Sequence, residues 1–179
     1  MKNMEKKKVL VVGCNGRMGQ LVCKAIAESE DFVVVAGYDV EYKKGLYDFP
    51  IFTSTSELAE LEVADDIDAV IDFSRPAATM AVLDFAIKYH IPTLIATTGF
   101  SDEEEEKIRN ASSCIAIFKS SNMAYSVNAV AQLFRIAVKL LPDYSYGISE
   151  IHHENKADAP SGTAKLFFDV INEAHGSDL

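Results

Sequence analysis

Apolar residues along this chain follow two alternating patterns. Short, mostly apolar runs, typical of strands buried on both faces, occupy 8–12, 32–38, 67–73, 91–96 and 113–119. Between these runs, apolar residues recur every three or four positions at 20–28 and from Pro76 onward, as in a helix with one buried face, and Ser101 with Glu104 fits a capping box that starts a further helix. Strands that alternate with helices predict a parallel sheet covered on both faces, an α/β fold. The weak pattern between 41 and 62 predicts only a short strand at 50–53 and a short helix near 56–61.

The pattern changes after residue 121. A long helical spacing at 129–141 ends at Pro142, an alternating stretch at 145–152 predicts a strand, and a last helix is expected at 161–174. Asn128, at the start of the first of these helices, is either a buried amide with satisfied hydrogen bonds or a residue that bonds a loop, and we favour the buried amide. We therefore expect two domains, a larger one at 1–121 and a smaller α+β domain at 122–179.

Composition narrows the class of protein. The 179 residues are 49% hydrophobic and 25% charged, which predicts a soluble globular protein, and the net charge of −10 argues against broad contact with nucleic acid or an anionic membrane. The apolar run after the charged N-terminus is too short for a signal peptide or a membrane span. Three isolated cysteines, without metal-ligand spacing, predict a reduced cytoplasmic location and no metal site.

A glycine-rich turn, Gly13-Cys-Asn-Gly-Arg-Met-Gly19, joins the first predicted strand to the first helix. In a Rossmann-like doubly wound sheet such a turn lets the backbone approach the pyrophosphate of a dinucleotide, which then faces the helix N-terminus. The spacing Gly-x-x-Gly-x-x-Gly differs from the commoner Gly-x-Gly-x-x-Gly. A purely structural turn therefore remains an alternative.

Asp39 ends the second predicted strand, close to the expected ~20 residues after the glycines. A carboxylate there accepts hydrogen bonds from the ribose diol of NAD and repels the extra phosphate of NADP. Val40 supplies no compensating cation, although Lys43 and Lys44 follow. The residue favours NADH over NADPH, unless it is only a strand-end turn residue.

Ligands of parallel sheets lie over the carboxyl ends of the strands, and several polar residues are expected at that edge. Thr97 and Thr98 are either turn residues or contacts for a nicotinamide. Ser74 and Arg75 are either a helix cap with a surface charge or part of the binding edge. Residues 120–122 follow the strand at 113–119 and are expected at the same edge.

The stretch at 150–164 carries the most chemistry. His152 and His153 precede Lys156, and all three side chains can deliver protons near neutral pH. Ser161-Gly-Thr163 then opens an apolar helix, where its amides would bind an anion. The alternative is a strand end with solvated polar residues.

Four motifs resemble one family when they are taken in order along nearly the whole chain. They are Val12-Gly-Cys-Asn-Gly-Arg-Met-Gly19, Ile71-Asp-Phe-Ser-Arg-Pro76, Ala96-Thr-Thr-Gly-Phe100 and Glu150-Ile-His-His-Glu-Asn-Lys-Ala-Asp-Ala-Pro-Ser-Gly-Thr163. This set resembles dihydrodipicolinate reductase, also called 4-hydroxy-tetrahydrodipicolinate reductase, a family of bacterial and plant lysine and diaminopimelate synthesis. The last motif is the most specific, and the glycine turn is much less so.

The resemblance implies reduction of a cyclic, conjugated imine dicarboxylate by NADH or NADPH. It implies that His152 donates or accepts a proton and that Lys156 donates one. His153, Ser161, Gly162 and Thr163 are then expected to bind the substrate. The implied cofactor contacts are Gly13, Cys14, Asn15, Gly16, Arg17, Met18, Asp39, Ala96, Thr97, Thr98, Ser120, Ser121, Asn122 and Met123.

The chain departs from the family pattern in two places. Family members that accept NADP often carry a basic residue where this chain has Val40. The sequence therefore favours NADH, and NADPH remains the alternative. Members also continue for several dozen residues beyond the position of Gly176, adding strands to a small domain that builds a homotetramer. The small domain is therefore expected to be incomplete, with an unpaired sheet edge, in a truncated form, an interrupted reading frame or a naturally short form. A non-catalytic dinucleotide-binding module is the competing hypothesis.

Overall fold

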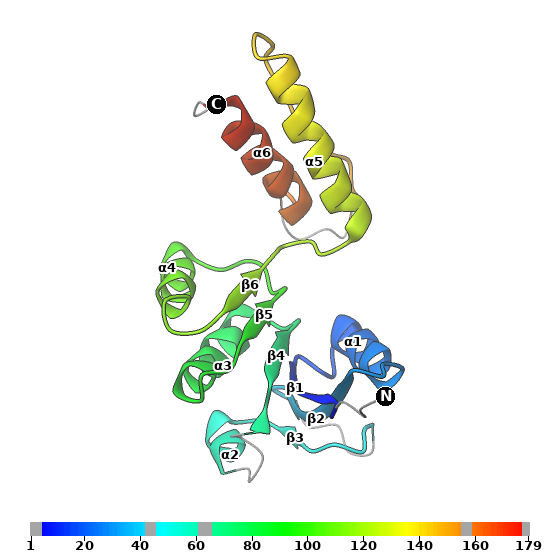
Figure 1. The fold of residues 1–179 in the computed structure, drawn as a ribbon, viewed down its shortest axis with the longest axis vertical. Coiled ribbons are helices and arrows are strands. Elements are labelled where there is room, and N and C mark those ends of the chain that lie inside the picture. Colours follow the sequence, from blue (N-terminus) through cyan, green and yellow to red (C-terminus); the bar gives the residue numbers. More distant parts are fainter. Residues whose placement is uncertain (1–4, 42–45, 61–65, 155–158, 177–179) are drawn as a thin grey trace. The chain divides into compact units, whose positions relative to one another are not determined.

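The computed structural model describes residues 5–41, 46–60, 66–154 and 159–176. The chain divides into two compact units, Met1–Ser120 and Ser121–Leu179, which are described separately here (Figure 1). No helix within the described ranges combines the length and apolar character needed to cross a membrane.

Unit 1 is built on a parallel sheet of six strands in the order β3-β2-β1-β4-β5-β6. The strands are β1 (Lys7–Val12), β2 (Phe32–Tyr38), β3 (Ile51–Phe52), β4 (Ala69–Asp72), β5 (Thr93–Ile95) and β6 (Ile117–Lys119). Strand β1 lies at the centre because its apolar run, Val9 to Val12, is fully buried and suits a position with a strand on each side. The structure confirms the predicted Rossmann-like, doubly wound α/β fold.

Four helices cover the two faces of this sheet: α1 (Arg17–Ala27), α2 (Thr55–Ala59), α3 (Pro76–Lys88) and α4 (Asp102–Ala111). Side chains alternate across a strand, so Leu10 and Val12 pack into one apolar cluster with residues of α2, α3 and α4. Val9 and Val11 pack on the other face with Cys23 and Ile26 of α1. Figure 1 shows α1 on one side of the sheet and the other three helices opposite.

The four helices differ in how their first turns are capped. Helices α2 and α4 both have capping boxes, and the one at Ser101 and Glu104 is as predicted. Helices α1 and α3 begin after Gly16 and Arg75 without any side-chain cap, and neither has an acidic residue in its first turn. No side chain therefore competes with an anion at these two helix starts, although in α3 Pro76 has no amide hydrogen and the Ala78 amide donates to the carbonyl of Arg75 at 2.9 Å.

Unit 2 contains two helices in its described part, α5 (Tyr125–Leu140) and α6 (Gly162–His175). The rings of Phe134 and Phe167 meet edge to face with centroids 4.9 Å apart, and Arg135 Nη2 lies 2.8 Å from Glu173 Oε2. Helix α6 ends at Gly176, whose φ of +73° is the left-handed conformation common after a helix.

Two predictions for this unit are wrong. Residues 145–152 form no strand, because a strand needs a paired neighbour and no described residue of unit 2 forms one; alternation alone cannot supply that partner. Asn128 is exposed rather than buried, and its amide donates to the carbonyls of Asn122 and Ala124, both at 3.0 Å. It bonds the loop before α5, the interpretation that we did not favour.

Candidate functional site

A pocket of about 470 Å³ lies at the carboxyl ends of β1 and β4 in unit 1. The chain leaves β1 toward α1 on one face of the sheet and leaves β4 toward α3 on the other, so a crevice opens between the two connections. Its lining residues are Gly13, Asn15, Gly16, Asp39, Val40, Glu41, Phe73, Ser74, Arg75, Ala77 and Ala78. The two helix starts that lack caps both border this pocket.

The glycine turn is packed against the turn that follows β4. Gly13 has a φ of +76°, and a Cβ on it would lie 2.6 Å from the carbonyl oxygen of Phe73. A Cβ on Gly19 would lie 2.0 Å from the carbonyl oxygen of Gly13, so α1 could not start this close to the strand with a side chain there. The predicted need for glycine thus has a steric cause at both positions.

Asp39 is half-buried at the end of β2 and holds the turn. Its Oδ2 accepts a hydrogen bond from the amide of Asn15 at 2.9 Å. The Asn15 side chain in turn donates to the carbonyl of Glu41 at 2.5 Å, while its buried Oδ1 has no partner among the described residues. Val40 beside it is 70% exposed, and Lys43 and Lys44 lie outside the described residues.

The remaining residues of the turn face different surroundings. Cys14 is fully buried on the α1 face of the sheet, where burial raises the pKa of its thiol to about 12, and only its backbone can serve a ligand. Arg17 and Met18 are exposed at the start of α1.

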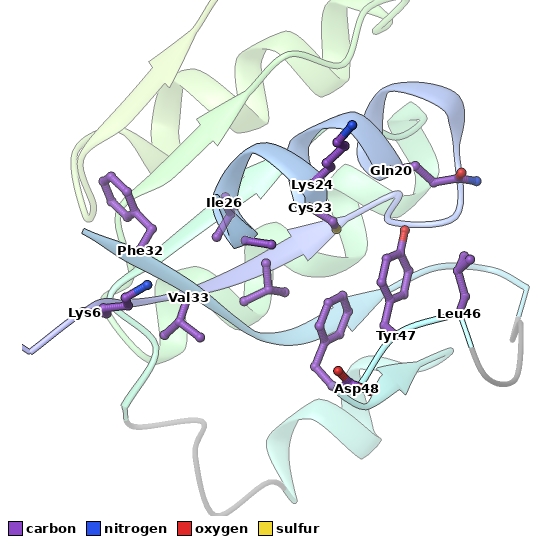
Figure 2. Close-up of a pocket in the computed structure, with 13 residues that line it drawn as sticks. Lys6, Gln20, Cys23, Lys24, Ile26, Phe32, Val33, Leu46, Tyr47 and Asp48 are labelled. Atoms are coloured by element: carbon purple, nitrogen blue, oxygen red, sulfur yellow. The ribbon is translucent and has the colours of Figure 1, made fainter. Parts of the chain in front are cut away.

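Two side chains hold the turn from the α1 face. The Tyr47 hydroxyl donates to the carbonyl of Cys14 at 2.7 Å, and Gln20 Nε2 donates to the carbonyl of Asn15 at 2.9 Å. Both line a second pocket of about 470 Å³ between α1, β2 and residues 46–49 (Figure 2). Sequence reasoning missed both residues.

A buried carboxylate, Asp72, links the ends of β4 and β5. It accepts hydrogen bonds from Ser74, Thr79 and Thr97, which lower its pKa, but burial raises the pKa by more. Thr97 is only 4% exposed and its hydroxyl is used by this carboxylate, whereas Thr98 is exposed. Sequence reasoning gave Asp72 no role, although an acid inside an apolar run just before a serine was a usable signal.

Ala96 and Ser120 are half-buried beside these residues. They follow β5 and β6, and their amides donate to Asp72 and Ile95 of the neighbouring strand at 2.8 and 3.1 Å. Unit 1 therefore brings its predicted contacts to one edge of the sheet, but the Thr97 hydroxyl is turned into the protein.

In unit 2, Glu150 joins the histidine pair to the start of α6. Its Oε2 lies 2.8 Å from His152 Nε2, and its Oε1 accepts from the amide of Ser161 at 2.8 Å. Hydrogen bonding from Ser161 and then from His152 lowers the pKa of Glu150 to about 2. We missed this residue, although its position two before His152 in an alternating stretch would place both on one face.

Helix α6 begins at Gly162, close to the start predicted at Ser161. The Ser161 hydroxyl accepts from the amide of Ala164 at 3.0 Å and caps the helix. The amides of Gly162 and Thr163 have no acceptor among the described residues. Since Glu150 uses the Ser161 amide, two rather than three amides of the predicted cradle remain for an anion.

The predicted residues after β6 meet this helix start. Ser121 Oγ donates to the carbonyl of Gly162, and Asn122 Nδ2 donates to Thr163 Oγ1, both at 3.1 Å. Met123 is half-buried, and His153 is exposed. Lys156 lies outside the described residues. No group of three or more His, Cys, Asp or Glu in the described ranges is arranged to hold a metal ion.

Comparison with known protein families gives matches over most of the chain. Residues 7–123 match the family described as dihydrodipicolinate reductase, N-terminus, and residues 126–178 match dihydrodipicolinate reductase, C-terminus.

Curated relatives agree with these matches. A 4-hydroxy-tetrahydrodipicolinate reductase from Caldanaerobacter subterraneus subsp. tengcongensis is 40% identical over 93% of this chain, and one from Clostridium tetani is 36% identical over 93%. The chain spans 63% of the length of each of these relatives.

A solved structure, dipicolinate-bound dihydrodipicolinate reductase from Paenisporosarcina sp. TG-14, is 24% identical with a TM-score of 0.76. It matches 97% of this chain, which covers 68% of that one. A myo-inositol dehydrogenase from Corynebacterium glutamicum is 18% identical with a TM-score of 0.56, over 76% of this chain and 42% of that chain. At these identities the two structures support the fold alone.

Proposed function

Because the chain belongs to the dihydrodipicolinate reductase family, we propose that it takes part in the nicotinamide-dependent reduction of 4-hydroxy-tetrahydrodipicolinate to tetrahydrodipicolinate. The relatives that carry this name match nearly the whole of the chain. We propose that this reaction belongs to lysine and diaminopimelate synthesis and takes place in the cytoplasm.

The residues of unit 1 fit a dinucleotide. Two helices without side-chain caps begin beside the pocket at the ends of β1 and β4, so their positive ends favour an anion there, and the glycines let a pyrophosphate approach the backbone. Asp39 keeps one carboxylate oxygen with only a weak bond, 3.4 Å from the Glu41 amide, and that oxygen can accept a ribose hydroxyl. The carboxylate and the uncharged Val40 favour NADH.

When bound, the reduced nicotinamide supplies the hydride, and the protein must supply the proton. We assign proton transfer to His152, whose imidazole is held by Glu150 Oε2 at 2.8 Å. The same carboxylate bonds the amide of Ser161, and this contact carries the proposal because it fixes the imidazole relative to the helix start. Lys156 is a second proton donor by resemblance.

The substrate is a dianion, and the start of α6 offers it a carboxylate site. The amides of Gly162 and Thr163 lie at the positive end of a helix of 14 residues. Ser161 fixes the helix start, and His153 is exposed in the same segment to contact the substrate.

The competing hypothesis is a dinucleotide-binding module without catalysis. It is favoured by one observation, that the residues lining the nucleotide pocket all come from unit 1.

Titration of the 179-residue chain with NADH and NADPH, followed by an imine-reduction assay, separates the two hypotheses. Binding with turnover is expected, with NADH bound more tightly than NADPH. Binding without turnover would support the module, and no binding would contradict both. The oligomeric mass, measured on the same sample, tests the proposed homotetramer.

A further inference from the structure

Asp72, at the end of β4, is the one acidic or basic side chain among the described residues that is buried, with an exposed fraction of 1%. A carboxylate at this depth is costly unless several donors satisfy it. It forms no salt bridge with any described residue and is not among the residues that line the nucleotide pocket.

The two oxygens of this carboxylate bind different elements. Oδ1 accepts from the Ser74 amide at 2.9 Å, from the Ser74 hydroxyl and from Thr97 Oγ1 at 3.0 Å. Oδ2 accepts from Thr79 Oγ1 at 2.5 Å, one turn into α3. One oxygen therefore holds the turn after β4, and the other holds the body of a helix.

The Oδ1 contacts fix the position of the turn at 73–75, which forms one wall of the nucleotide pocket. Ser74 and Arg75 line the pocket, and the Ser74 amide also donates to Thr97 Oγ1 at 3.0 Å. The carbonyl of Phe73 is so close to Gly13 that even a methyl group would not fit between the two turns. A small displacement of this wall thus changes the space beside the glycine turn.

We propose that Asp72 is a positioning residue for the dinucleotide, acting through Oδ1 and Thr97 on the turn at 73–75. Its Oδ2 contact with Thr79 serves only to stabilise α3. The inference rests on the proposed nucleotide binding by unit 1. If Asp72 had a merely structural role, loss of a contact to either oxygen would lower the stability of the fold, and neither loss would change the affinity for the dinucleotide.

Thr97→Val and Thr79→Val form a matched pair for the test. Both threonines are buried, at 4% and 2%, and each substitution removes one hydroxyl that donates to Asp72 while keeping the side-chain shape. Dissociation constants for NADH are measured by nicotinamide fluorescence on the full chain, and melting temperatures by circular dichroism.

We expect both variants to melt a few degrees lower, because each leaves a buried group with one bond fewer. Thr97→Val should weaken NADH binding about fivefold, the equivalent of one neutral hydrogen bond, and Thr79→Val should leave it within about twofold. The proposal would be overturned if the two variants bound NADH with the same affinity, whether that affinity was unchanged or lowered.

A double-mutant cycle separates this route from direct contact between Thr97 and the cofactor. In an Asp72→Ala background, Thr97→Val should cause a smaller loss of NADH affinity than in the unaltered chain, because the Thr97 hydroxyl then keeps only its contact with the Ser74 amide at 3.0 Å. A full additional loss would show that Thr97 acts by itself and would overturn the role of Asp72. If Asp72→Ala does not fold, the matched pair decides. If the unaltered chain binds no nucleotide, the proposed function fails, and the inference fails with it.

Discussion

Glu150 shows how a single carboxylate organises the candidate catalytic segment. It contacts both His152 and the start of α6, and these contacts lower its pKa to about 2 from an ordinary 4.5. A carboxyl whose pKa is lowered by folding stabilises the folded chain above its unfolded pKa. That contribution is lost as the pH falls from about 4.5 toward about 2.

We therefore expect Glu150→Gln to remove a pH-dependent part of the stability. The difference in unfolding free energy between the unaltered chain and the variant should be constant from pH 7 to about 5 and shrink at lower pH. Urea denaturation followed by circular dichroism at several pH values measures it. Glu154→Gln is the control, an exposed carboxylate in the same segment. A difference that does not change with pH would contradict the role of the Glu150 contacts.

A substitution of the single residue Val40 can test why the chain would prefer NADH to NADPH. Val40 is 70% exposed and lines the nucleotide pocket next to Asp39, so a longer side chain can be accommodated. A guanidinium there can bind the extra phosphate of NADPH. Val40→Arg should shift the ratio of NADPH to NADH affinity about tenfold toward NADPH.

Val40→Gln is the matched control, because it adds length and hydrogen bonding without charge. Fluorescence titration with both cofactors, at low and high salt, measures the ratio. If Val40→Gln shifts the affinity ratio by the same amount, charge is not the cause. If neither variant shifts the ratio, the extra phosphate of NADPH does not lie beside residue 40.

At the scale of elements, the connection between β1 and α1 depends on a segment that the hydrophobic pattern left undefined. Tyr47, which Figure 2 labels, stacks on Phe49 with centroids 4.5 Å apart, and its hydroxyl donates to the carbonyl of Cys14. This contact holds the glycine turn at the residue before Asn15, whose amide is held by Asp39.

Tyr47→Phe keeps the ring and removes only that hydrogen bond. We expect a loss of about 1 kcal/mol of unfolding free energy and a weaker affinity for NADH, since the turn would be less ordered. Leu46→Ala, which shortens a neighbouring side chain of the same pocket, should leave NADH affinity unchanged. Urea denaturation and NADH titration measure both effects, and unchanged affinity in Tyr47→Phe would show that the turn does not need this support.

The elements themselves were largely predictable from the sequence. Five of the six strands of unit 1 coincide with the predicted apolar runs, because a strand buried on both faces has no polar alternation to obscure it, and β3 lies within the short strand predicted at 50–53. The strand predicted at 145–152 was wrong because alternation reports only that two faces differ, and it does not report a partner strand.

The candidate site was predictable where side chains act through local spacing. The glycine turn, Asp39 and the helix start at Ser161 could be read from their neighbours in sequence. Tyr47 contacts the turn across 33 positions, and Thr97 contacts Asp72 across 25. Such contacts depend on which strands become neighbours, and no local pattern contains that information.

At the scale of the whole molecule, the two candidate functions belong to different units. The residues lining the nucleotide pocket lie in unit 1, and the contacts of Glu150, His152 and α6 lie within unit 2. The chain as a whole carries a net charge of −10, so local helix starts and cations would have to attract an anionic cofactor and the proposed dianionic substrate. A substitution of His152 should then alter proton transfer without altering nucleotide binding.

His152→Ala is the sharpest test of that separation. Loss of a proton-transferring side chain should lower kcat by about 10² to 10⁴, while the dissociation constant for NADH stays the same because His152 is not among the residues that line the nucleotide pocket. Steady-state reduction of the imine substrate gives kcat and KM, and nicotinamide fluorescence gives the affinity. His153→Ala is the control, expected to raise KM more than it lowers kcat because the exposed imidazole contacts substrate without transferring the proton. Near-normal turnover in His152→Ala would move proton transfer to another group, with Lys156→Ala the next variant to measure.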